Sequence, residues 1–264
     1  ATTPLQNALS YTDWRGVFTG LAVITVFASI CLWVFLPENK RTDEKLPSLK
    51  LQLKEMGEVF RSRIFWDIAP LAAISQGANM AINGLWMKPW LRDVAGLNSD
   101  NAAQLLFVMT LAFIGGFLTL GIIAERLSQL FDIRPISISV FGMTLFLFIQ
   151  GTMIFGGFGS PLILVLLLGF FGTASVLVYA GYAQIFPKYL SGRVSTILNL
   201  LVFICAFILQ WGVGVIIEMW PVTETGYDPE SYQAAIGVLF LLQATGLIWY
   251  FLSLKLSRKQ GVLI

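Results

Sequence analysis

Seven long apolar runs follow one another along the chain, each near the roughly 20 residues that a helix needs to cross a bilayer. They lie at roughly 16–36, 66–90, 102–124, 135–156, 161–186, 194–217 and 232–254. Prolines and glycine-rich turns separate them, as at Pro37, Pro135 and residues 156–161. The runs are continuous rather than alternating, which favours helices over a lipid-facing barrel. We therefore predict an all-α integral membrane protein with seven transmembrane helices.

One of these runs, residues 66–90, carries a polar stripe. Gln76, Asn79 and Asn83 fall at positions 0, 3 and 7 of a helix, within about 60° of one another. Unpaired amides in hydrocarbon cost several kcal/mol, so this face should contact protein or water rather than lipid. Hydrogen bonds to a neighbouring helix are one interpretation, and the wall of a cavity is the other. Trp86 and Trp90 either extend the stripe or act as interfacial anchors.

The composition supports a membrane protein and excludes several kinds of site. The chain is 56% apolar and 12% charged, with a net charge of +2 and no histidine. This charge is too small and too scattered for nucleic-acid binding. Cys31 and Cys205 lie inside apolar runs, far from acidic residues. We therefore expect no metal, no cofactor, no disulfide framework and no enzymatic activity.

Basic residues predict the orientation. Fourteen of the 17 lysines and arginines lie in the connection at 37–65, near residues 126–134 and 188–193, or in the C-terminal tail. The positive-inside rule places these segments in the cytoplasm, so the N-terminal residues would lie outside. No signal peptide precedes them, and we expect that earlier spans belong to the same protein. The stretch Leu49–Phe60 has an apolar stripe, which predicts a helix on the membrane surface or an ordinary linker helix.

Four sequence stretches resemble a known transporter family. "DWRGVF" at 13–18 and "LPE" at 36–38 flank the first span as they flank the sixth helix of a major facilitator superfamily transporter. "GIIAERLSQ" at 121–129 is similar to the family's cytoplasmic loop motif, although Ser128 and Gln129 replace its second Gly and Arg. "FPKYLSGRVSTILN" at 186–199 resembles the connection between the tenth and eleventh helices.

The resemblance implies a domain organisation. The seven spans would correspond to helices 6–12 of a twelve-helix fold, and the chain would run from the end of helix 5 through helix 12. Residues 1–36 would end the N-terminal half, residues 37–65 would form a cytoplasmic linker with an amphipathic helix, and residues 66–264 would form the C-terminal six-helix half. The missing N-terminal half would be the partner of this part.

The resemblance also implies where a solute would bind, because such transporters bind it between the two halves. The expected substrate-binding residues are Gln76, Asn79, Asn83, Tyr179, Tyr182 and Asn199. For the tyrosines, anchoring at the membrane surface is the alternative. The expected gating residues are Glu125, Arg126 and Arg193, which could equally be surface ion pairs or determinants of orientation. Gln150 and Gln243 would lie on peripheral helices and have a structural role.

Together these features predict transport of a small solute by alternating access, either driven by a gradient or facilitated. A receptor or assembly scaffold on the same fold is the alternative. No Asp, Glu, Lys or Arg lies deep in any predicted span, so a coupling proton or ion would bind in the other half, or none is used. We expect a multi-pass protein of the bacterial inner membrane with a cytoplasmic C-terminus.

Overall fold

The computed structural model describes residues 3–35, 48–155, 159–223 and 226–259, and these residues are almost entirely helical. The helices are α1 (Thr3–Tyr11), α2 (Trp14–Phe35), α3 (Leu49–Arg61), α4 (Arg63–Ala81), α5 (Met87–Asp93), α6 (Ser99–Phe131), α7 (Pro135–Thr152), α8 (Pro161–Phe171), α9 (Leu177–Ile185), α10 (Lys188–Ile217) and α11 (Pro229–Lys259). Shorter elements are the π-helix η1 (Ile82–Trp86) and the 3-10 turns η2 (Met153–Phe155) and η3 (Ala174–Val176). An antiparallel hairpin, β1 (Val222–Thr223) and β2 (Gly226–Tyr227), joins α10 to α11.

Within these ranges, six helical segments are long and apolar enough to cross a membrane. They begin at Trp14, Ser99, Pro135, Pro161, Lys188 and Pro229. The prediction of an all-α membrane protein is therefore confirmed. The remaining predicted span is also helical without a break from α4 through η1 to α5. It stands apart from the six because its amides and charged ends lower its mean hydropathy.

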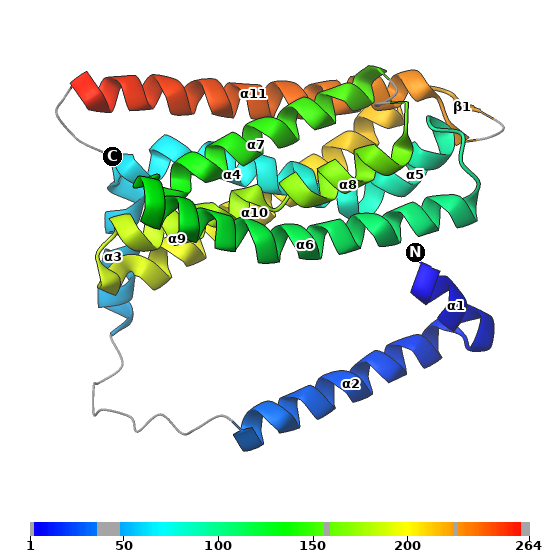
Figure 1. The fold of residues 1–264 in the computed structure, drawn as a ribbon, viewed down its shortest axis with the longest axis horizontal. Coiled ribbons are helices and arrows are strands. Elements are labelled where there is room, and N and C mark those ends of the chain that lie inside the picture. Colours follow the sequence, from blue (N-terminus) through cyan, green and yellow to red (C-terminus); the bar gives the residue numbers. More distant parts are fainter. Residues whose placement is uncertain (1–2, 36–47, 156–158, 224–225, 260–264) are drawn as a thin grey trace.

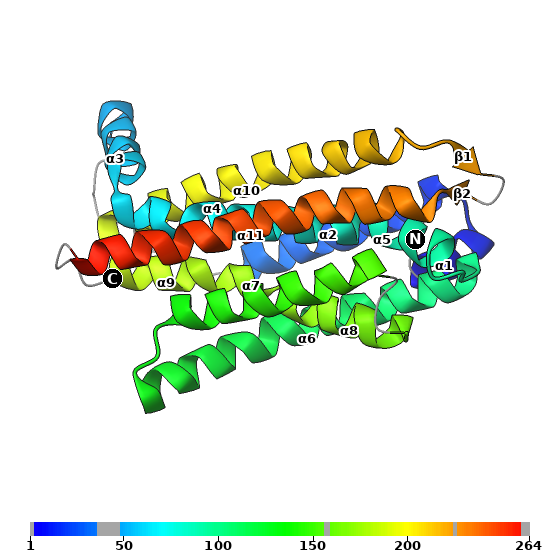
Figure 2. The same ribbon diagram turned by 90° about the horizontal axis from the view of Figure 1, so that it is seen from above.

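The connections between the long helices gather at two opposite ends of the bundle (Figures 1 and 2). At one end lie α3 and the α6–α7 and α9–α10 connections, and we call this the basic end. At the other, the hairpin end, lie the β1–β2 hairpin, α1 and the end of α5. Arg134, Lys188 and Arg193 lie at the basic end as expected, whereas Lys40, Arg41 and Lys45 are outside the described residues. Alternating passage through a membrane produces this segregation.

Helix α2 lies apart from the bundle that α4 to α11 form (Figure 1). None of its residues is buried, and large apolar side chains such as Phe18, Phe27 and Trp33 are exposed all around it. The short helix α1 connects it to the bundle by contacts with α6. An apolar helix that is uncovered on every side can lie in lipid or against another protein surface, but not in water.

The core of the bundle forms two apolar clusters, one toward each end. The first joins α4, α7, α9 and α10 around Phe65, Val140 and Val202, and the second joins α4, α5, α8 and α11 around Trp90, Leu168 and Leu239. Small residues permit close helix contacts where packing rather than water exclusion drives association. A Cβ on Gly169 of α8 would lie 2.5 Å from the Met109 carbonyl of α6. These contacts fix the spacing between the helices that surround the site.

Helix α3 matches the predicted amphipathic helix. Ser48 caps its start by accepting a hydrogen bond from the Leu51 N–H at 3.3 Å. Val59 is buried against the bundle, while Leu49 and Leu53 of the apolar stripe are exposed. Part of the stripe therefore remains uncovered at the basic end, where a membrane surface would lie.

Candidate functional site

The polar run of the sequence contains a change of helical register. The helix follows the α pattern through Ala81, continues as the π-helix η1, and becomes α again at Met87. In η1 the N–H of Met87 donates to the carbonyl of Ile82, five residues earlier. Such single π turns often occur at functional sites, because they place side chains where a regular helix would not.

Gln210 of α10 forms hydrogen bonds on both sides of η1, to Met80 before it and to Trp86 at its end. Its side-chain Nε2 donates to the Met80 carbonyl at 3.2 Å, and the Trp86 indole Nε1 donates back to the Gln210 carbonyl at 3.2 Å. A Cβ on Gly214, one turn further along α10, would lie 3.2 Å from the Trp86 ring. The two helices thus bracket the irregular turn with two hydrogen bonds and a close ring contact. In hydrocarbon, irregular backbone needs partners of this kind.

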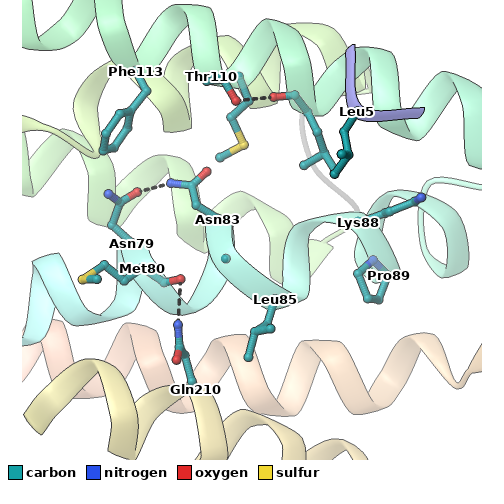
Figure 3. A pocket seen from close by; sticks show the side chains of 13 residues that line it. Leu5, Asn79, Met80, Asn83, Leu85, Lys88, Pro89, Thr110, Phe113 and Gln210 are labelled. Carbon is teal, nitrogen blue, oxygen red and sulfur yellow. Dashed lines mark hydrogen bonds between the residues drawn. The ribbon is translucent and has the colours of Figure 1, made fainter. Parts of the chain in front are cut away.

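The other side of the turn presents the two asparagines. The side-chain Nδ2 of Asn83 donates to Oδ1 of Asn79 at 2.5 Å. The two amides thus satisfy one donor and one acceptor and leave the other polar atoms of the pair for a further partner. The side chains of Asn79 and Asn83 both point toward α6 across an open space (Figure 3).

This open space is a cavity of about 820 Å³ in the hairpin-end half of the bundle. The residues around it come from α1, α4, η1, α5, α6 and α10 and include Leu5, Asn79, Met80, Asn83, Gly84, Lys88, Leu106, Met109, Thr110, Phe113 and Gln210. Its wall is mostly apolar, with a few amide, hydroxyl and ammonium groups. Cavities of this size and composition are typical of small-molecule sites.

Gly172, the residue directly after α8, lies very close to Asn79. A Cβ on Gly172 would collide with Oδ1 of Asn79 and with the Leu168 carbonyl. A larger residue at position 172 would therefore push the Asn79 side chain from its place. The same asparagine is 3% exposed, so backbone packing on one side and Asn83 on the other determine its direction.

A family model describing the major facilitator superfamily matches residues 2–208. The chain belongs to this superfamily. It is therefore a multi-pass membrane transporter, and its long apolar helices agree with this. A search of curated proteins finds no significant match.

The other residues predicted to bind solute do not line this cavity. Gln76 lies one helical turn before the pair, and its Oε1 is buried without a partner among the described residues. Tyr179 donates to Oδ1 of Asn199 at 3.4 Å, joining α9 to α10 nearer the basic end. Tyr182 is 1% exposed and donates to the Phe65 carbonyl at 2.6 Å. Tyr182 therefore packs in the core and does not line the cavity.

The predicted gating residues fall into two different settings. Glu125 and Arg126 are exposed near the basic end of α6, and Glu125 accepts from Nε2 of Gln129 at 3.2 Å. Neither forms an ion pair with another described residue. Arg193 of α10 is bound to α3 instead, with its Nε 3.0 Å from Oε2 of Glu55. Tyr189 adds a hydrogen bond of 3.3 Å to Glu58 on the same helix.

Two tryptophans do not act as interfacial anchors. Trp90 is 1% exposed in the core, and Trp86 is half-buried with its indole on Gln210. The expected substrate-binding residues included neither Gln210 nor Thr110, which both line the cavity. The amide at Gln210 is a signal in an otherwise apolar helix, whereas a lone threonine is not.

Asp93 organises the hairpin end and escaped the sequence analysis. Its carboxylate is 1% exposed and accepts from the Tyr232 hydroxyl at 2.7 Å and the Tyr227 N–H at 3.2 Å. The neighbouring Arg92 donates to it at 2.8 Å, and this hydrogen bond, with the carboxylate charge, raises the pKa of Arg92. The network ties the hairpin to α5 directly after the cavity.

No group of three or more metal-ligating side chains occurs in the part of the chain that the structure describes. The site therefore consists of amides, one hydroxyl, one ammonium and an apolar wall. This arrangement can bind a solute by hydrogen bonds and apolar contact.

Proposed function

We propose that this transporter moves a small solute by alternating access and that the cavity beside η1 is its binding site. The observation that supports this most is the position of the amides. Asn79 on α4 and Asn83 on η1 lie on one polar face of a continuous helix and line an open space. Transporters of this general kind bind solute at irregular helices near the middle of the membrane.

In this proposal the second wall of the cavity is contributed by the half expected upstream of Ala1. The two halves rock about the solute and expose it to each side in turn. The turn at η1 supplies a place where the helix can change direction, and Gln210 holds one of its conformations. Gln76, and the Tyr179–Asn199 pair nearer the basic end, would continue the polar path.

The basic end is proposed to face the cytoplasm of a bacterial cell, because fourteen of the 17 lysines and arginines lie in the connections and the tail that the positive-inside rule places there. No carboxylate lines the cavity among the described residues. A coupling proton would therefore need a group elsewhere in the complete protein, and facilitated transport needs none.

The test is transport by the complete protein that contains this chain, reconstituted in proteoliposomes. The vesicles are incubated with a metabolite extract of the source cells, and their contents are measured by mass spectrometry with and without pH and voltage gradients. Accumulation of a defined solute supports the proposal. Binding of a solute without flux would assign a receptor function and overturn it.

A matched pair of variants tests the site. Asn79→Ala/Asn83→Ala should lower accumulation of that solute about tenfold or more, while Gln150→Leu/Gln243→Leu, outside the cavity lining, should not. Equal flux in both variants and in the unmodified protein would remove the cavity from the proposal.

A further inference from the structure

Lys88 is the one charged side chain among the described residues that line the cavity. It lies on α5, two residues after the irregular segment ends at Trp86, and Figure 3 shows its side chain at the Leu5 end of the cavity, pointing away from Asn79 and Phe113 at the other end. Its ammonium has no hydrogen bond or ion pair with another described residue. The rim of the cavity at the Leu5 end therefore carries a positive charge that no other described residue pairs with.

The nearest basic neighbour along α5 does not share this property. Arg92 lies one turn further, but it is paired with Asp93 at 2.8 Å and contributes little net charge. Lys88 is also one of only three basic residues in segments predicted to face outward. Lys88 lies on the side of the membrane where the positive-inside rule predicts few cations, and it has no partner among the described residues. We therefore expect it to bind an anionic group.

We propose that the cavity selects amphipathic solutes that carry an anionic group and that Lys88 attracts this group. This rests on the proposed function and names the substrate class. Asn79 and Asn83 would bind the polar remainder of the solute through the amide atoms they leave unpaired. Met80, Met109 and Phe113 form an apolar wall for its hydrocarbon part, and methionines adapt to varied shapes.

The charge should act at a distance, because a cavity with low-dielectric walls focuses the field of one charge on its interior. A lysine that only reaches outward to anchor the helix at the membrane surface would leave the potential at Asn83 nearly unchanged. The two cases differ in a quantity that can be measured without knowing the solute.

The experiment measures that potential with two thiol reagents of similar size. The complete protein carries Cys31→Ala, Cys205→Ala and Asn83→Cys and is placed in nanodiscs of neutral phosphatidylcholine. It is modified with anionic sulfonatoethyl and cationic trimethylammonioethyl methanethiosulfonates. Lys88→Gln should lower the ratio of the anionic to the cationic rate about threefold or more, and Lys88→Arg should preserve it. The control is Asn101→Cys, which is exposed on α6 outside the cavity lining and whose ratio should change less.

The possible failures are distinguishable. An unchanged ratio in Lys88→Gln overturns the role of Lys88 and leaves the proposed function standing. No reaction at Asn83→Cys with either reagent means that the cavity is closed to water, which overturns the site of the proposed function as well.

A second measurement decides the question if Lys88→Gln does not fold. With Lys88 present, benzoate should slow the modification at Asn83→Cys more than benzamide, and benzylamine should slow it least. The reverse order would overturn the inference. Slowing by phosphatidylglycerol in the nanodisc, without slowing by benzoate, would assign the charge to lipid binding and also overturn it.

Discussion

Two pairs of amide side chains lie inside this bundle, and their polar atoms are satisfied in different ways. Gln150 on α7 and Gln243 on α11 are both 0% exposed, and Nε2 of Gln243 donates to Oε1 of Gln150 at 2.6 Å. Asn79 and Asn83 bond along one helix at 2.5 Å and border a cavity of about 820 Å³. The glutamines join two helices, whereas the asparagines leave their free atoms facing open space.

The comparison shows that an amide in an apolar helix can have either a structural or a binding role. Polar groups in a dry interior are stabilised only by each other, so the glutamine pair adds to the connection between α7 and α11. Beside a cavity, water or a solute can satisfy the same atoms. Function therefore follows from the space around the amide and not from the residue type.

The largest expected effect is on transport. Asn79→Ala/Asn83→Ala removes two side chains that would bind solute, and each lost hydrogen bond is worth about 0.5–1.5 kcal/mol, so flux should fall about tenfold or more. Gln150→Leu/Gln243→Leu should keep flux within about twofold, because both partners are replaced together. Initial rates in proteoliposomes, normalised to inserted protein, give the comparison. A larger loss in the glutamine variant would reverse the roles of the two pairs.

The next largest effect is on stability, and here the glutamine pair should matter more than the asparagine pair. Gln243→Leu alone leaves the Gln150 amide buried without its partner, which should lower the free energy of unfolding by about 1–3 kcal/mol. Asn83→Ala should cost less, because water in the cavity can reach Asn79. Thermal unfolding in detergent measures both. The double variant Gln150→Leu/Gln243→Leu should recover most of the loss, and a loss equal to that of the single variant would contradict this reading of the pair.

The sequence predicted the spans well, because 20 apolar residues in series permit few structures other than a transmembrane helix. It also predicted that the stripe at Asn79 and Asn83 faces something polar. It could not predict the π turn at Ile82–Trp86, whose side-chain partner is Gln210, 124 residues beyond Trp86. Tyr182 shows the same limit. Its position on the helix suited a binding site, but the carbonyl that it contacts belongs to Phe65 on another helix.

A smaller effect should follow from releasing the irregular turn. Gln210→Leu removes the donor to the Met80 carbonyl, and interhelical hydrogen bonds in membranes are worth about 0.6–2 kcal/mol. We expect a loss of stability of about 1 kcal/mol together with faster amide exchange in η1. Hydrogen exchange measured by mass spectrometry checks this, with Gln210→Asn as the matched variant that keeps the amide but shortens its reach. Unchanged exchange in η1 would mean that the turn does not depend on Gln210.

The smallest effect is expected where polar groups are partly solvated rather than buried or beside a cavity. Arg193 and Glu55 are joined at 3.0 Å, but 30% and 13% of their side chains are exposed. A double-mutant cycle with Arg193→Ala and Glu55→Ala should give a coupling of about 0–1 kcal/mol, because water and salt screen the pair. The coupling should fall as salt is added, and α3 should exchange its amides faster in either variant. Flux that changes several-fold while α3 stays protected would instead favour the gating role of Arg193, since an ion pair that only docks the linker helix has no reason to alter transport.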